Sequence, residues 1–264
     1  MNTAPCNDGL PDERLMIDRV AQIDSTNSEL LRREPLLPAG SAAQAIWLVA
    51  RRQSAGRGRR DRPWRSSADG SLTASFGIDM RLGRPSNPAA LSLVAGVAVA
   101  QVLAEHDTQV RLKWPNDIYV AGGKAGGILC EARARGEVTR LVIGCGLNLI
   151  APAPGEIDQP AAGLFELATL PERGRLEVGL GLALLAAVTR WQVQGLAPFR
   201  NAWRARDLLS GEKVVIHDYS GIRYGVARGI ADDGALIAEL QESPGRLVYL
   251  NSGEVSIRKL PLAG

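Results

Sequence analysis

The hydrophobic pattern of the first 150 residues predicts mainly strands. Apolar or alternating runs predict strands at 14–23, 45–52, 71–80, 110–120, 121–134 and 139–150. Pro115 interrupts the segment 110–120, and the glycines just after this segment predict a turn. The segments 110–120 and 121–134 are therefore expected to pair as a hairpin.

Helical patterns lie between and after these strands. They predict helices at 25–33, 89–106, 176–194 and 198–209. Thr26 and Glu29 have the T-x-x-E spacing of a capping box, which predicts that the first helix starts there.

The pattern changes after Gly211. Short apolar segments are separated there by the turn sequences SG, DDG, SPG and NSG, which predicts a small β-barrel or sandwich. A boundary is therefore expected near 209–211. The sequence predicts a flexible tail at 1–13, a large unit at 14–209 and a small β-rich unit at 210–264.

The charge of the chain is concentrated in one segment. The 264 residues carry a net charge of +3, yet residues 51–65 alone hold seven arginines against one aspartate. A short basic loop favours a small anionic ligand over a long nucleic-acid track, which needs an extended basic patch. A solvated arginine loop without a ligand would have the same composition.

Cysteine usage and hydropathy narrow the class of protein. Cys6, Cys130 and Cys145 lack metal-ligand spacing, and no apolar run approaches 18 residues. The first residues do not resemble an apolar leader. These features favour a reducing, cytoplasmic protein that does not use a membrane.

Candidate chemistry begins with the motif KWPND at 113–117. The stiff Trp114 and Pro115 would hold Lys113, Asn116 and Asp117 in a defined arrangement. Only four of the 31 basic residues of the chain are lysines. A lysine ammonium is a compact point charge that can contact a single oxygen, so Lys113 in this motif suggests such a contact. A hairpin with a surface lysine is the alternative.

Three further motifs place polar groups beside glycines or at a helix start. Lys124 in GGKAGGIL could point into a site that the backbone approaches closely, and Asn148 in GCGLNL suits a base or ribose. The segment 25–27, Ser-Thr-Asn, could bind a polar ligand head. A flexible turn, a strand end and a helix cap explain these three motifs equally well when each is taken alone.

Taken together and in this order, the motifs resemble those of the biotin protein ligases. The matching segments are STN at 25–27, QSAGRGRRDRPW at 53–64, KWPND at 113–117, KAGGILCE at 124–131, GCGLNL at 144–149 and GEVSIR at 253–258. The resemblance covers roughly residues 15–260. It implies an α+β fold with a mixed-sheet catalytic domain, similar to class II aminoacyl-tRNA synthetases and lipoyl ligases, and a C-terminal SH3-like barrel.

The resemblance also implies a reaction in two steps. Biotin and ATP, with Mg²⁺, form biotinyl-5′-AMP, and a lysine of the biotin carboxyl carrier protein of acetyl-CoA carboxylase then takes the biotin. The basic loop would close over the anionic intermediate and exclude water. Asp61, where many family members have glycine, and Pro63 depart from the family pattern, which leaves the kinetics of loop closure open.

Roles for individual residues follow only from this resemblance. The biotin-binding candidates are Ser25, Thr26, Asn27, Gln53, Gly56, Arg57, Arg59, Lys124 and Gly126. The ATP- and adenylate-binding candidates are Arg57, Arg59, Arg60, Trp64, Lys113, Asn116 and Asn148. Lys124, Arg59, Lys113 and Asp117 are the catalytic candidates, and Asp117 either holds Mg²⁺ or accepts the proton of the incoming lysine.

The sequence also leads to expectations about binding partners and to alternative functions. The catalytic motifs begin by residue 25, which leaves no room for the N-terminal helix-turn-helix of bifunctional family members, so no DNA-binding role is expected. An exposed sheet edge could serve a homodimer or the carrier protein. The alternatives are a lipoate or octanoate ligase and a nucleic-acid-binding module that uses the arginine loop.

Overall fold

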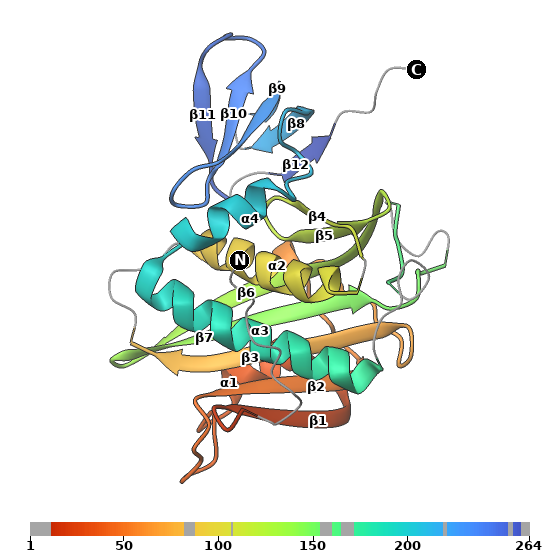
Figure 1. The fold of residues 1–264 in the computed structure, drawn as a ribbon, viewed down its shortest axis with the longest axis vertical. Coiled ribbons are helices and arrows are strands. Elements are labelled where there is room, and N and C mark those ends of the chain that lie inside the picture. The colour runs from red at the N-terminus through yellow and green to blue at the C-terminus, as the bar shows by residue number, and fades with distance from the viewer. Residues whose placement is uncertain are drawn as a thin grey trace.

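The computed structural model describes residues 12–81, 88–106, 108–153, 160–164, 172–218, 221–252 and 256–259. Residues 1–11 of the expected tail, residues 253–255 of GEVSIR and the side chain of Asp61 lie outside this description. The described chain forms a seven-stranded sheet covered by helices and a five-stranded sheet that follows it (Figure 1).

The large sheet is mixed, as the resemblance implies. Its strands are β1 (Leu15–Ile23), β2 (Ala45–Gln53), β3 (Ser71–Met80), β4 (Val110–Lys113), β5 (Asp117–Val120), β6 (Gly123–Arg135) and β7 (Val138–Asn148). They lie in the order β1-β2-β3-β7-β6-β5-β4, with only β1 and β2 parallel. The predicted α+β class is confirmed.

One predicted strand is two strands. The segment 110–120 was expected as a single interrupted strand, but β4 and β5 form an antiparallel hairpin around the cis Trp114–Pro115 peptide. Proline cannot donate to a strand ladder, so the chain reverses at that point. The hairpin expected between 110–120 and 121–134 exists as the pairing of β5 with β6.

The two faces of the large sheet have different partners. The helices α2 (Pro88–Ala104) and α3 (Arg173–Gln194) cover one face, and α1 (Thr26–Arg32) lies on the other (Figure 1). In the strand β3, apolar and polar residues alternate between these two faces of the sheet. Its residues Leu72, Ala74 and Phe76 enter the core shared with α2 and α3. Ser71, Thr73 and Ser75 alternate with them and point to the α1 side.

The start of α1 differs from the expected capping box. Ser25, not Thr26, is the N-cap, and its Oγ accepts from the backbone N–H of Ser28 at 3.3 Å. Glu29 does not close a box, because its carboxylate pairs with Arg32 and Arg33 on its own helix. The cap moves by one residue, which leaves the hydroxyl of Thr26 available for contacts outside the helix.

The C-terminal unit is a five-stranded antiparallel sheet, in agreement with the expected small β domain. Its strands are β8 (Lys213–Asp218), β9 (Gly221–Ile230), β10 (Leu236–Leu240), β11 (Leu247–Leu250) and β12 (Ser256–Lys259), in the order β11-β10-β9-β8-β12. The helix expected at 198–209 is shorter: a 3₁₀ turn at Ala197–Phe199 leads into α4 (Arg200–Arg204), and the chain then runs along β4. Trp114 joins the two units by donating its Nε1–H to the carbonyl of Gly234 at 3.0 Å.

The helix α3 is long and apolar enough to match a membrane span by length and composition alone. The sequence pattern gave no such expectation. Leu176, Leu180, Leu184 and Val188 of α3 are buried in the core against the large sheet. Burial within the protein accounts for the apolar character of this helix, so it indicates a core helix.

Arg140 of β7 joins the C-terminal end of α1 to the sheet. Its side chain is 1% exposed and makes a bidentate ion pair with Asp79 on β3, with both N–O distances at 2.7 Å. The same guanidinium donates to the carbonyls of Leu30, at 3.1 Å, and of Arg33. Arg140 therefore satisfies carbonyls that the end of a helix leaves without partners.

Replacing Arg140 should destabilise the fold. We expect Arg140→Ala to lower the free energy of unfolding by about 3 kcal/mol, since it leaves Asp79 and two carbonyls without their donor. Arg81→Ala is the matched control, because the Arg81–Glu137 pair is solvent-exposed and worth less than about 1 kcal/mol. Urea unfolding of both variants measures the difference, and equal losses would contradict a structural role for Arg140.

Candidate functional site

The sequence-predicted residues gather on the α1 side of the large sheet, around the buried amide of Asn27. Asn27 Nδ2 donates to the carbonyl of Leu129 at 3.2 Å and to Glu131 Oε2 at 2.8 Å. Asn27 Oδ1 lies 2.5 Å from the hydroxyl of Ser75 on β3. The amide is therefore satisfied at both ends by two different strands.

The network continues from Asn27 to the start of the basic loop. The backbone N–H and the hydroxyl of Thr26 both approach Gln53 Oε1, at 2.7 and 3.0 Å, and the Ser75 hydroxyl lies 2.7 Å from that of Thr26. Ser25 lies beside these residues because its side chain caps the start of α1. The expected biotin-pocket residues Ser25, Thr26, Asn27 and Gln53 are thus brought together at the first turn of α1.

Two glycines of GCGLNL make room for this site. A Cβ on Gly144 would collide with Asn27 Oδ1, and a Cβ on Gly146 would lie 2.6 Å from the indole of Trp64. Both glycines of β7 face α1, because residues two apart share a face of a strand. The motif therefore leaves room on the sheet for one amide and one indole.

The two glycines predicted as site residues, Gly56 and Gly126, allow close backbone contacts. Gly56 accepts from the N–H of Trp64 at 2.8 Å, and a side chain there would meet the Trp64 carbonyl at 2.5 Å. Gly126 on β6 lies against the carbonyl of Gly146, 2.5 Å from where its Cβ would stand. Glycine is needed at both positions because the backbones approach too closely for a Cβ.

Arg57 of the basic loop reaches the same network. Its Nη2 contacts both oxygens of Glu131, at 2.9 and 3.0 Å, so Glu131 is shared between Arg57 and Asn27. Within the described residues, Arg57 Nε and Trp64 Nε1 are buried and have no hydrogen-bond partner. Buried donors without partners are costly, and these two belong to the loop residues that pack on Glu131 and on Gly146.

Arg59 links the loop to the hairpin and to the C-terminal unit. Its Nη1 donates to Asn116 Oδ1 at 3.3 Å and its Nη2 donates to the carbonyl of Ser252, while Asn116 Nδ2 donates to the Ile128 carbonyl at 2.8 Å. Burial, with the charge of Arg60 next in effect, lowers the pKa of Arg59 from its ordinary value. Arg60 itself is exposed, so the structure places it at the edge of the site.

Lys124 and Asp117 form an ion pair at the beginning of β6. Lys124 Nζ lies 2.6 Å from Asp117 Oδ1, and both side chains are about four-fifths buried, at 20% and 19% exposed. Lys113, opposite Asp117 in the β4–β5 register, lies 5.7 Å from the ring centre of Tyr119. Asn148 donates to the Lys124 carbonyl at 3.3 Å. The catalytic candidates therefore adjoin the nucleotide-binding candidates.

A permanent metal centre has no support within the described residues, where no three His, Cys, Asp or Glu side chains form a possible metal-binding group. Mg²⁺ usually keeps several waters and binds through one or two carboxylates plus substrate phosphates. Asp117 offers one carboxylate of that kind, and in this structure it pairs with Lys124.

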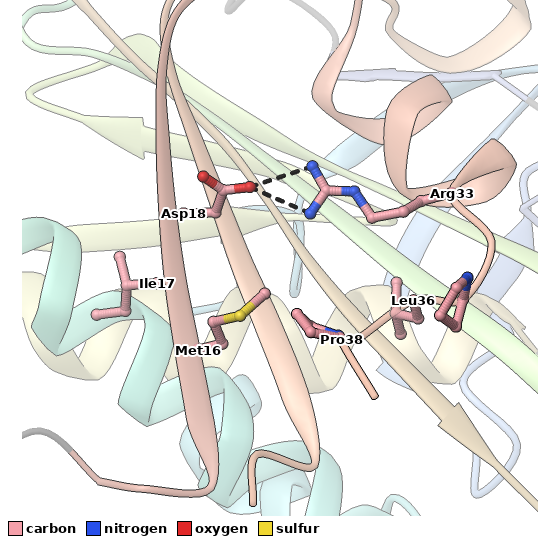
Figure 2. Close-up of a pocket in the computed structure, with 7 residues that line it drawn as sticks. Met16, Ile17, Asp18, Arg33, Leu36 and Pro38 are labelled. Carbon is pink, nitrogen blue, oxygen red and sulfur yellow. Dashed lines mark hydrogen bonds and ion pairs between the residues drawn. The ribbon is translucent and has the colours of Figure 1, made fainter. Parts of the chain in front are cut away.

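A hollow of about 400 Å³ lies elsewhere, at the other end of α1. It is lined by Met16, Ile17, Asp18, Arg33, Pro35, Leu36 and Pro38, and the Asp18–Arg33 ion pair spans it (Figure 2). None of the predicted site residues lines it. The candidate site is instead the polar surface described above, filled in part by its own ion pairs.

Sequence reasoning missed Ser75, Glu131 and Ser252. Glu131 ends the segment KAGGILCE, and a lone carboxylate in a motif expected to bind anions was a signal that an arginine would pair with it. Ser75 belongs to the polar face of an alternating strand. For Ser252 no signal existed, because only its backbone carbonyl takes part.

Comparisons with known proteins agree with this site and fold. Residues 20–148 match the Biotin/lipoate A/B protein ligase family, and residues 209–258 match the Biotin protein ligase C terminal domain. The Biotin--[acetyl-CoA-carboxylase] ligase of Paracoccus denitrificans is 38% identical over 234 residues, which is 83% of this chain and 92% of that protein. The Biotin--[acetyl-CoA-carboxylase] ligase of Mycobacterium tuberculosis is 34% identical over 245 residues, or 90% of this chain and 88% of that protein.

A solved structure extends the comparison to three dimensions. The biotin protein ligase from Aquifex aeolicus in complex with biotin and ATP has a TM-score of 0.76 at 26% identity, covering 93% of this chain and 99% of that one. The mixed sheet, its polar α1 face and the small C-terminal β unit define the class of biotin and lipoate protein ligases. Within that class, the chain belongs to the biotin protein ligase family.

The close approach at Gly146 can be tested directly. We expect Gly146→Ala to destabilise the protein by about 1–3 kcal/mol, because the added methyl displaces the Trp64 indole from β7. Gly174→Ala is the control: apart from its chain neighbours and the backbone of its own helix, no atom of the described structure lies within 4 Å of the added Cβ, and alanine in this helical position should stabilise. Chemical denaturation compares the two, and unchanged stability of Gly146→Ala would refute the packing argument.

Proposed function

We propose that the protein is an ATP-dependent ligase that attaches biotin to a lysine of the biotin carboxyl carrier protein of acetyl-CoA carboxylase. The observation that carries the proposal is the gathering of three cationic side chains, Arg57, Arg59 and Lys124, on the side of the sheet that holds the Thr26–Asn27–Gln53 network. Such a site can hold a polar head group and an anion together. The names and bound ligands of the relatives support this choice of substrates.

In the first step, a carboxylate oxygen of biotin attacks the α-phosphorus of ATP. The bond from phosphorus to the pyrophosphate oxygen breaks, which gives biotinyl-5′-AMP and pyrophosphate. The reacting groups are both anionic, so cationic side chains must offset their repulsion. Arg57, Arg59 and Lys124 supply that charge from three positions, and Lys124 is held at its place by Asp117.

In the second step, the neutral ε-amine of the carrier lysine attacks the acyl carbon of the mixed anhydride. The bond from that carbon to the AMP oxygen breaks, an amide forms, and the amine loses a proton. Asp117 is a candidate acceptor for that proton, and it is also the carboxylate that would hold the Mg²⁺ accompanying ATP. A bound Mg²⁺ would neutralise phosphate charge, and the two roles of Asp117 stay open.

Trp64, Asn148 and Asn116 are the residues that we assign to recognition of the adenine nucleotide. The indole of Trp64, lying on Gly146, would offer a flat surface for a base. Asn148, held by the Lys124 carbonyl, and Asn116, held by the Ile128 carbonyl, would contact the nucleotide as well. Lys113 lies on the same hairpin and would contact phosphate oxygens. The exposed Arg60 would meet the nucleotide only if the loop closed further over it.

Cellular location and assembly remain predictions. The cysteines Cys130 and Cys145 are both unpaired, as expected for a reducing, cytoplasmic setting. The strand β1 is one edge of the large sheet, whereas residues 206–208 pair with part of the other edge at β4. We propose β1 as the edge that a second copy or the carrier protein would use.

The proposed function is tested by isotope exchange. Biotin-dependent exchange of labelled pyrophosphate into ATP should occur with Mg²⁺, and lipoate in place of biotin should give none. Exchange with lipoate alone would make the protein a lipoate ligase. Absence of exchange with either acid, together with binding of nucleic acid that weakens steeply with salt, would favour the nucleic-acid-binding alternative.

Lys124→Ala should slow this exchange about 100-fold or more, which is the usual loss when one preorganised charge contact to a transition state is removed. Lys213→Ala is the control, since Lys213 is an exposed residue at the start of β8. Steady-state exchange rates at saturating biotin and ATP measure the effect. A Lys124→Ala rate equal to that of the control would remove Lys124 from the mechanism.

Arg59→Gly should loosen the loop and release the adenylate. Arg59 connects the loop to Asn116 and to Ser252, and both connections are lost in the variant. We expect the free anhydride to acylate lysines of unrelated proteins. Mass spectrometry of bovine serum albumin incubated with the variant, biotin and ATP detects this, and strict carrier specificity would contradict a lid role.

A further inference from the structure

We infer that Glu131 is a positioning residue that fixes Arg57 over the biotin pocket and couples the basic loop to α1. This inference rests on the proposed function and adds a residue to it. Glu131 was not among the residues expected from the sequence. Among the described residues, its carboxylate hydrogen-bonds both Arg57 of the loop and Asn27 of the helix.

The geometry of the Arg57–Glu131 pair leaves ligand-binding donors available. Only Nη2 of Arg57 contacts the carboxylate, at 2.9 and 3.0 Å, and Nη1 makes no hydrogen bond to the described residues. A guanidinium has five N–H donors in a rigid plane, so fixing one nitrogen fixes the direction of the others. Glu131 therefore orients Arg57 and does not consume its capacity to bind an anion.

The surroundings of Glu131 favour a fixed carboxylate. Its side chain is 24% exposed and that of Arg57 is 34% exposed, so solvent screens this pair less than a surface pair. Asn27, which donates to the second side of Glu131, is itself held by Ser75 and by the Leu129 carbonyl. A displacement of α1 at Asn27 would therefore move Glu131 and, with it, Arg57.

This arrangement predicts a specific kinetic consequence. Since Glu131 acts through Arg57, its loss should reduce the rate of adenylate formation, and any change in the KM for ATP should be no larger than the change caused by Arg57→Ala. A charge-assisted hydrogen bond of this kind corresponds to a loss of about 10- to 100-fold in rate. The glutamine variant keeps an oxygen acceptor and should lose less than the alanine variant.

The experiment is a double-mutant cycle on the full-length chain. Adenylation rates are measured for wild type, Glu131→Gln, Arg57→Ala and the double variant, with Glu137→Gln as control. Glu137 lies at the tip of the hairpin that joins β6 to β7 and pairs with Arg81 in solvent. We expect Glu131→Gln to slow adenylation about tenfold alone and less than twofold in the Arg57→Ala background. Independent, multiplicative losses would overturn the inference.

A second measurement does not depend on activity. Phenylglyoxal modifies accessible arginines, and mass spectrometry follows Arg57 and the exposed Arg62 of the same loop separately. Glu131→Gln should raise the modification rate of Arg57 several-fold and leave that of Arg62 unchanged. Equal rates for Arg57 in the two proteins would refute the positioning role. Absence of pyrophosphate exchange by the wild type would instead refute the proposed function while this test still stands.

Discussion

The buried amide of Asn27 is the constraint on which the site depends. An amide in that position needs an acceptor for its N–H groups and a donor for its oxygen, and leaving either unmet costs about 1–3 kcal/mol. Ser75, the Leu129 carbonyl and Glu131 meet these needs from β3 and β6. Because those partners lie on different strands, α1 can sit on the sheet in only one position.

Several other features follow from that position. Gly144 has no side chain because Asn27 occupies the space above it, and Glu131 is placed where the basic loop can reach it with Arg57. At the opposite end of α1, Arg140 holds the last carbonyls to β7 and β3. The helix is thus fixed at both ends, and the residues that it carries are arranged before any ligand arrives, which lowers the ordering cost of binding.

The basic loop contacts both the large-sheet unit and the C-terminal unit of the protein. Arg57 joins it to the large sheet, and Arg59 joins it to the β4–β5 hairpin and to the carbonyl of Ser252 in the C-terminal unit. Trp114 of that hairpin in turn donates to Gly234. The C-terminal unit therefore contributes to the placement of Arg59 through the loop after β11, so loop position and domain packing are physically linked.

The sequence by itself predicted the order of most elements, because helical and period-two patterns are local signals. The mixed catalytic sheet and the candidate site residues came from the resemblance of its short motifs to those of the biotin protein ligases. The sequence misplaced the cap of α1, because the Thr26 hydroxyl bonds to Gln53 and Ser75 instead of capping the helix. It merged β4 with β5, because a turn of three residues does not interrupt an apolar pattern enough to show that the strand reverses. Only the tertiary structure decided which charges meet. Asn27 and Glu131 are 104 residues apart, and Arg59 and Ser252 are 193 apart. Contacts at such separations depend on how the strands pair, which no local pattern encodes.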